Sequence, residues 1–162
     1  MKNVLFRMFL AMGLLLGAVA PGLADPIQAL VNQVSETYYT NYLQNGLYTH
    51  QGNNRNDGKP DHDSAKTFIY NTLSGFGLST GYDNGTYGGA AYSNVVATLP
   101  GQVYPQQIYI VGAHYDSVDC PGADDNASGV AAVLEAARIL SQYQFERTIL
   151  FIAFDREEDG LI

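Results

Sequence analysis

Residues 108–117 read IYIVGAHYDS, an apolar run that ends in polar side chains. A continuous apolar run of this length is typical of a strand that is buried on both faces. Residues 148–158 read TILFIAFDREE and repeat the pattern, because a second apolar run leads into acidic residues. The two stretches predict buried strands over 108–113 and 148–154, each of which delivers polar side chains at its carboxyl end.

A helix is predicted between these strands, from about Ser128 to Gln142. Glu135 and Arg138 lie off its apolar face, which forms one stripe at helical spacing. That stripe consists of Val130, Val133, Leu134, Ala137 and Leu140. A strand, a helix and a strand in this order form a βαβ unit with parallel strands and a right-handed crossover. We therefore expect an α/β fold with a mixed, mainly parallel sheet that is flanked by helices.

The chain before this unit supplies a further strand and two helices. Residues 94–99 are a third strand candidate, closed by Pro100 and Gly101. Apolar residues at helical spacing predict one helix over 26–42 and another that starts at Ser64, as its cap, and runs to about residue 74.

Two segments are expected to be irregular. Residues 44–63 are rich in Gly, Asn and Asp and predict a loop. Residues 80–91 are rich in glycine and predict a turn-rich excursion. His50 and His62 fall in the first of these segments, so we expect both to be exposed loop histidines.

Three polar segments are expected to meet at one edge of the sheet. In open α/β sheets, sites form beyond the carboxyl ends of the strands. The first buried strand delivers His114 and Asp116 there, and the second delivers Glu157 and Glu158. The stretch between the first strand and the helix, PGADDNASG at 121–129, carries further acids. Parallel strands would bring all three segments together, which predicts a shared site.

The residue types of this site suit a divalent metal. Imidazole and carboxylate together favour zinc among the common metals. His114 and Asp116 are two residues apart, so in an extended segment both point to the same side. The acid can then hold the imidazole ring, which is a usual arrangement around metal-binding histidines.

Simpler structural roles are open to some of these acids. Asp124 and Asp125 stand at a helix start, where acids cap the helix and complement its dipole, and for Asp124 we favour that role. Adjacent glutamates such as Glu157 and Glu158 are most often a solvated surface pair. Their place directly after a buried strand favours a functional role instead. Since adjacent side chains diverge, one can bind a metal while the other faces a bound water as a general base.

Three motifs, in order and with compatible spacing, resemble those of the co-catalytic dizinc exopeptidase family, which includes bacterial leucyl aminopeptidases and aminopeptidase Y. They are VGAHYDS at 111–117, PGADDNASG at 121–129 and EEDGL at 157–161. The resemblance is strong from Asn94 onward, and it implies a zinc exopeptidase-like fold.

The resemblance also implies roles for single residues. His114 corresponds to a ligand of one zinc ion, Asp125 to the carboxylate that bridges two zinc ions, and Glu158 to a ligand of the second. Glu157 corresponds to the general base, and Asp116 to the acid that orients His114. The implied reaction is hydrolysis of the N-terminal peptide bond of a peptide or protein, with two zinc ions per complete domain.

The family pattern needs a further Asp and a further His downstream of Glu158, whereas the sequence ends at Ile162. We therefore expect residues 25–162 to be the N-terminal portion of the catalytic domain, with a sheet that is truncated at the C-terminus and keeps an exposed edge. Other readings stay open: an inactive exported remnant, or a glutaminyl cyclase or a glutamate-type carboxypeptidase of the same fold.

The first 24 residues have the pattern of a secretory signal peptide. Lys2 and Arg7 precede the apolar run from Met8 to Val19, and Ala24 offers a small residue at the cleavage position. We therefore expect a secreted or periplasmic protein without a membrane anchor after cleavage.

Charge and cysteine content limit the partners. The formal net charge of −8 would repel phosphate backbones, which argues against nucleic acid as a partner. Cys120 is the one cysteine, so an intramolecular disulfide is excluded, and we expect it to be structural. Peptide or protein N-termini are the expected substrates, and the protein is expected to be a monomer.

Overall fold

The computed structural model describes residues 25–48 and 54–160 of the 162-residue chain. The predicted signal peptide and His50 lie outside the described residues. Within them, the helices are too short or too polar to span a lipid bilayer.

Four strands form one mixed sheet in the order β1-β2-β4-β3. Their bounds are Ser79–Tyr87 for β1, Ala90–Leu99 for β2, Tyr104–His114 for β3 and Arg147–Phe154 for β4. β3 and β4 run parallel, whereas β1 pairs with β2 and β2 with β4 in antiparallel fashion. The predicted α/β class with a mixed sheet is confirmed, but among the described strands the parallel pairing is confined to one pair. The sheet is therefore less parallel than we expected.

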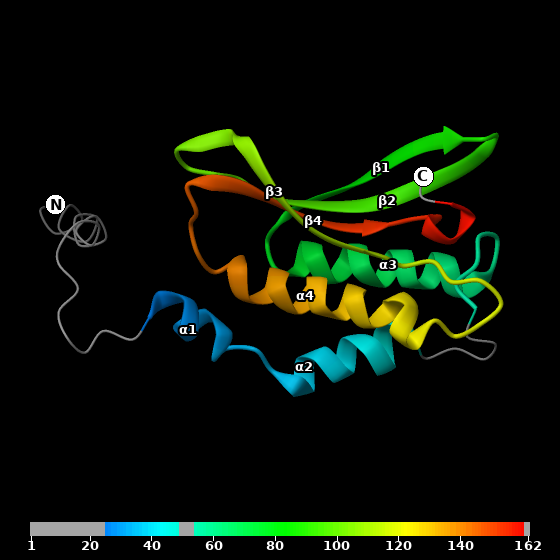
Figure 1. Ribbon diagram of the computed structural model, residues 1–162, viewed down its shortest axis with the longest axis horizontal. Coiled ribbons are helices and arrows are strands. Elements are labelled where there is room, and N and C mark those ends of the chain that lie inside the picture. The colour runs from blue at the N-terminus through cyan, green and yellow to red at the C-terminus, as the bar shows by residue number, and fades with distance from the viewer. Residues whose placement is uncertain (1–24, 49–53, 161–162) are drawn as a thin grey trace, which may run out of the picture.

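Two helices cover one face of this sheet (Figure 1). They are α3, Pro60–Gly75, and α4, Ser128–Leu140, and both lie on the same side of the strands. The core lies between these layers, and its largest fully buried apolar members include Ile69, Leu73, Val95, Val130, Leu134 and Phe151.

The predicted βαβ unit is present as β3, α4 and β4. The apolar stripe of α4 packs into the core as predicted, with Leu140 partly buried at its end. Glu135 does not lie off the packed face, because its side chain is buried with 3% exposure. It accepts hydrogen bonds from Arg138 at 2.6 and 2.8 Å and from the Ser35 N–H at 2.7 Å. Its buried negative charge is therefore paired with a guanidinium and hydrogen-bonded.

The segment predicted as a turn-rich excursion is a β-hairpin. β1 pairs along its whole length with β2, and only Gly88 and Gly89, at φ 57° and 87°, form the turn. Glycine reaches such positive φ values without a steric cost, so the pair makes a tight reversal. The prediction was wrong because the other glycines of this segment lie within a strand that pairing with β2 stabilises.

The helix predicted over 26–42 is interrupted. It divides into α1, Pro26–Val31, and α2, Glu36–Asn41, and a π-helical segment, Tyr42–Leu47, follows. Ser35 starts α2 by accepting a hydrogen bond from the Tyr38 N–H at 3.4 Å. Hydrogen bonding by this serine competes with a continuous helix, which explains the break.

α3 begins four residues earlier than predicted. Lys59 is extended, Pro60 occupies the first turn, and Asp61 and Asp63 complement the helix dipole there. Ser64 is therefore no cap, and its hydroxyl donates to the Pro60 carbonyl at 2.8 Å. His62 consequently lies in the helix and not in a loop.

β3 forms one edge of the described sheet and β1 the other, whereas β4, the apolar strand nearest the C-terminus at which we expected the exposed edge, is paired on both sides. Ile108 and Ile110 are 54% and 59% exposed although they belong to an apolar strand. Only the last residues of β3, Ala113 and His114, are buried. The strand is thus enclosed at the end that carries the predicted site and open along the rest of its length.

Candidate metal centre

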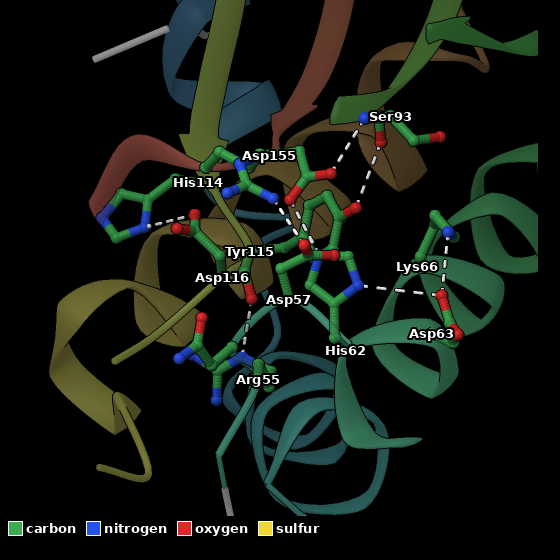
Figure 2. Close-up of polar contacts among 12 residues, drawn as sticks. Arg55, Asp57, His62, Asp63, Lys66, Ser93, His114, Tyr115, Asp116 and Asp155 are labelled. Atoms are coloured by element: carbon green, nitrogen blue, oxygen red, sulfur yellow. Dashed lines mark hydrogen bonds and ion pairs between the residues drawn. The ribbon is translucent and has the colours of Figure 1, made fainter. Parts of the chain in front are cut away.

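The parallel pairing of β3 and β4 places two polar segments side by side. His114, the last residue of β3, is in register with Phe154, the last residue of β4. The chain therefore leaves both strands at the same edge of the sheet, first with Tyr115 and Asp116 and then with Asp155. This edge is shown in Figure 2.

Three of the predicted site residues converge here. One ligand atom from each of His114, Asp125 and Glu158 lies within 4.8 Å of the others. His114 is buried, whereas the carboxylates of Asp125 and Glu158 are exposed and face solvent. An imidazole nitrogen with two carboxylate oxygens is a donor set that zinc accepts. The predicted convergence of the three segments is therefore found.

The His114 ring lies between acids. Its Nε2 atom is 3.0 Å from Asp125 Oδ1 and 3.6 Å from Glu157 Oε2. Its Nδ1 atom is 3.3 Å from Asp116 Oδ1, although the geometry does not make a hydrogen bond and leaves this buried nitrogen unsatisfied. Asp116 thus lies behind the ring, as expected for an acid that orients a metal-binding histidine.

Asp116 has a second role that the sequence did not indicate. Its buried carboxylate accepts hydrogen bonds from the backbone N–H groups of Glu157 at 3.2 Å and Glu158 at 3.1 Å. One acid from the end of β3 therefore holds the turn after β4, η3 at Glu157–Asp159, beside His114.

The acids of this site crowd one another. Partial burial and the negative charge of Asp125 raise the pKa of Glu158. Arg156 has φ 61°, which turns the chain so that Glu157 and Glu158 face the His114 side. A bound cation would relieve the repulsion among these carboxylates. The donor set fits a metal on the Nε2 side of His114, whereas Nδ1 faces Asp116 on the other side of the ring.

Asp125 lies in the turn η2, Ala123–Ala127, where its backbone and that of Asn126 are not helical, and its side chain is 79% exposed. Asp124, for which we predicted a capping role, makes no side-chain hydrogen bond to the start of α4. Asn126 provides that contact instead, because its Oδ1 accepts from the Gly129 N–H at 3.0 Å. An amide oxygen from within the turn reaches the helix start better than the acid two residues earlier.

Arg55 supports the loop between β3 and η2, a role that we did not predict from sequence. The residue is 1% exposed, and its guanidinium donates to the carbonyls of Tyr115 at 2.7 Å, Pro121 at 2.5 Å and Gly122 at 2.9 Å. Burial lowers its pKa, and the negative charge of Asp116 acts in the opposite direction. An arginine in a polar segment has no pattern that predicts carbonyl partners 60 residues away in the sequence.

A second buried histidine lies on the other side of Tyr115. His62 is 3% exposed, so the prediction of an exposed loop histidine is wrong. Its Nε2 contacts Asp155 Oδ1 at 2.8 Å, and its ring packs at a tilt against Tyr115 with 4.9 Å between centroids. Burial opposes ionisation of Asp155, but the contacts with His62 and the Ser93 N–H prevail and hold its pKa below the ordinary value.

Cys120 is exposed and free. The prediction of a structural cysteine is therefore not supported by packing. Its backbone carbonyl accepts a hydrogen bond from the Ser117 hydroxyl at 3.0 Å, a contact that any residue could provide.

The second part of the chain is similar to known proteins. Residues 94–162 match the model of Peptidase family M28. This M28 segment contains most of β2, all of β3, α4 and β4, and each predicted site residue. A probable zinc metalloprotease of Pyrenophora teres f. teres is 48% identical to the chain over 79 residues, which cover 43% of the chain and 17% of the relative.

Solved structures resemble a larger part of the chain. A glutaminyl cyclase from Macrostomum lignano matches with a TM-score of 0.67 and 24% identity, over 86% of the chain and 44% of that protein. A leucine aminopeptidase precursor from Bacteroides thetaiotaomicron matches with a TM-score of 0.62 and 22% identity, over 76% and 47%. At these identities the likeness concerns the fold alone.

The chain therefore spans less than a fifth of its fungal relative and less than half of either solved structure. The resemblance to zinc exopeptidases that the three motifs indicated is confirmed for the M28 segment.

Proposed function

We propose that this chain carries the zinc-binding part of a secreted exopeptidase, an aminopeptidase that hydrolyses N-terminal peptide bonds. The observation that carries the proposal is the convergence of His114, Asp125 and Glu158 within 4.8 Å, with Glu157 beside them. Similarity of the M28 segment to zinc metalloproteases supports it.

In this proposal the chain's own residues divide the work. His114, Asp125 and Glu158 would together hold the zinc, because one ligand atom of each lies within 4.8 Å of the others. Bound zinc polarises a carbonyl and lowers the pKa of water. Glu157 accepts the proton of the attacking water, because its carboxylate faces the same space as His114 Nε2. Asp116 keeps the imidazole of His114 oriented.

The expected substrate is the N-terminus of a peptide or protein. The net charge of −8 and the acids around His114 would attract a cationic amino group. The leucine aminopeptidase precursor among the similar folds is consistent with that substrate. Together with the N-terminal pattern typical of export, this leads us to propose a monomeric enzyme of the periplasm or the medium.

Hydrolysis of leucine p-nitroanilide by the purified full-length gene product tests the proposal. We expect release of p-nitroaniline that disappears with a chelator and returns on addition of zinc. Activity that is indifferent to the chelator would contradict a metal mechanism. Zinc binding without any hydrolysis would favour the alternative of an exported remnant that retains a metal site.

A second candidate is a glutaminyl cyclase, because one similar fold is that of such an enzyme. Peptides with an N-terminal glutamine distinguish the two reactions. Cyclisation releases ammonia and keeps the peptide length, whereas aminopeptidase action releases free glutamine. A peptide with a blocked N-terminus adds a third outcome, since loss of its last residue would indicate a carboxypeptidase. Mass spectrometry of the products separates all three.

A further inference from the structure

A buried cluster lies directly behind the candidate metal centre. Figure 2 shows His62 and His114 on the two sides of Tyr115, with Asp155 above them. His62 comes from the first turn of α3, whereas Asp155 is the first residue after β4. The two residues are 93 positions apart and belong to different layers of the fold.

Asp155 is held by three separate contacts. Its Oδ1 atom is 2.8 Å from His62 Nε2, and its Oδ2 atom accepts from the Ser93 N–H at 2.8 Å. Its own N–H donates to the side-chain oxygen of Asn94 at 2.8 Å. Because an ionised carboxylate can only accept, His62 Nε2 carries the hydrogen in this contact. His62 is the member of this set that comes from the helix layer.

Tyr115 ties the same cluster to the end of β3. Its ring packs against His62, and its hydroxyl donates to the Ser93 carbonyl at 3.1 Å. Tyr115 directly follows His114, and its N–H donates to the Phe154 carbonyl at 2.8 Å. The cluster therefore contacts the backbone next to His114 and the backbone that leads to Glu157.

The turn that carries the glutamates is tied to its surroundings through Arg156, which pairs with Asp57 and Asp159 and donates to the Ala91 carbonyl at 3.3 Å. Arg156 separates Asp155 from Glu157, and the backbone N–H groups of Glu157 and Glu158 bond only to Asp116 among the described contacts. Four carboxylates, those of Asp116, Asp125, Glu157 and Glu158, face one imidazole and repel each other. The contacts of Arg156 are made mostly with exposed acids, so a buried anchor at Asp155, on the side away from these charges, would add to them in keeping the turn in place.

We propose that His62 is a positioning residue for the metal centre: by donating to Asp155, it holds the end of β4 so that Glu158 stays within coordinating distance of His114 and Asp125. The proposal rests on the proposed function only in so far as the site binds zinc. It does not depend on which bond the protein cleaves. No contact between His62 and the metal is required.

Zinc affinity of the full chain tests this proposal without reference to activity. We would measure it by competition with a chromophoric chelator for the wild type, His62→Leu and His62→Gln. Leucine keeps the apolar bulk and removes the donor, whereas glutamine places an amide N–H near the position of Nε2. Loss of a hydrogen-bond partner behind a metal ligand lowers affinity by about 10-fold to 100-fold. We expect about tenfold for His62→Leu, and recovery in His62→Gln.

The control variant separates positioning from stability. Leu73→Ala removes buried apolar contacts from α3 about three turns from His62, so it destabilises the same helix away from the site. We expect its zinc affinity to equal that of the wild type. The absorption spectrum of the Co²⁺-loaded protein should change in His62→Leu and remain unchanged in Leu73→Ala, because the spectrum reports ligand geometry.

The outcomes are distinct. If His62→Leu binds zinc as tightly as the wild type, or if Leu73→Ala loses as much affinity, the positioning role is overturned. If His62→Leu does not fold, His62→Asn replaces it, because its shorter amide cannot reach Asp155 as glutamine can. Equal affinities for the Asn and Gln variants would then overturn the proposal. Tight zinc binding without peptide hydrolysis would refute the proposed function alone.

Discussion

Two buried histidines lie on opposite sides of Tyr115, and each contacts aspartate. The His62 region is enclosed, and its acid, Asp155, has partners for both carboxylate oxygens. The His114 region is open on the side of Asp125, and its ring nitrogen Nδ1 has no hydrogen bond although it is buried. The first region is electrostatically complete, whereas the second has excess negative charge.

This contrast explains how one edge of a sheet can be both rigid and reactive. A satisfied buried polar cluster stabilises and specifies the structure, and an unsatisfied one is costly unless a ligand completes it. In this protein the unsatisfied His114 region lies directly against the satisfied His62 region. Substitutions that affect one region and spare the other can therefore test whether the His114 region binds the metal and the His62 region positions it.

The largest expected effect belongs to the open region. Glu157→Gln removes the base but keeps the shape of the side chain, so we expect turnover of leucine p-nitroanilide to fall by about 10²-fold to 10⁴-fold. Zinc content, measured by atomic spectroscopy, should not change. Glu146→Gln, an exposed acid at the other end of β4, is the matched control and should retain full activity. Normal turnover in Glu157→Gln would show that another group is the base.

Zinc should stabilise the chain through the open region. At a free zinc concentration 100 times the dissociation constant, a ligand that binds only the folded state adds about 2.7 kcal/mol to the free energy of unfolding. We expect this gain in urea titrations of the wild type and its loss in His114→Ala. A variant of the enclosed region, His62→Gln, should keep it. An equal gain in His114→Ala would place the zinc elsewhere.

A smaller effect, on zinc affinity, is expected from Asp116, which accepts hydrogen bonds from the backbone of Glu157 and Glu158. Asp116→Asn keeps an acceptor for one of the two glutamate N–H groups but removes the charge behind His114, so zinc affinity should fall by about 10-fold to 100-fold. Competition with a chromophoric chelator measures this change. Asp119→Asn, an exposed acid of the same loop, serves as the control. Similar losses in both variants would indicate a general effect of charge.

The smallest expected effect is the pH dependence of the unfolding free energy that Asp155, in the enclosed region, contributes. Because the pKa of Asp155 is lowered in the folded state, its ionised form stabilises the protein above the ordinary aspartate pKa of 3.8, and this contribution is lost as the pH falls through the lowered value. The difference in unfolding free energy between the wild type and Asp155→Asn should therefore be constant above that pH and shrink below it. A difference that grows on acidification would reverse the assigned sign.

The strands and the helix that could be predicted from sequence are those with a continuous run or stripe of apolar residues. The apolar runs of β3 and β4 and the stripe of α4 fix a βαβ unit, and that unit alone brings His114, Asp125 and Glu158 together. The hairpin of β1 was missed because pairing with β2 outweighs the low strand preference of its glycines.

Long-range polar contacts could not be predicted in the same way. His62 and Arg55 lie in a segment with no periodic pattern, and their partners are one distant acid and a set of backbone carbonyls. Every residue type has a backbone carbonyl, so the type of the partner residue does not reveal such a hydrogen bond. Glu135 was misplaced for a related reason, since Arg138 makes its burial tolerable.

The exposed strand β3 has a consequence for the behaviour of the protein in solution. From Tyr104 to Ala113 it carries no charged residue, while Ile108 and Ile110 face outward on the outermost described strand. Lysine and other charges on outer strands normally prevent extended chains from adding to a sheet, and here they are missing. Concentrated preparations should therefore precipitate over time as β-rich fibres that bind thioflavin, and Ile110→Lys should keep them clear.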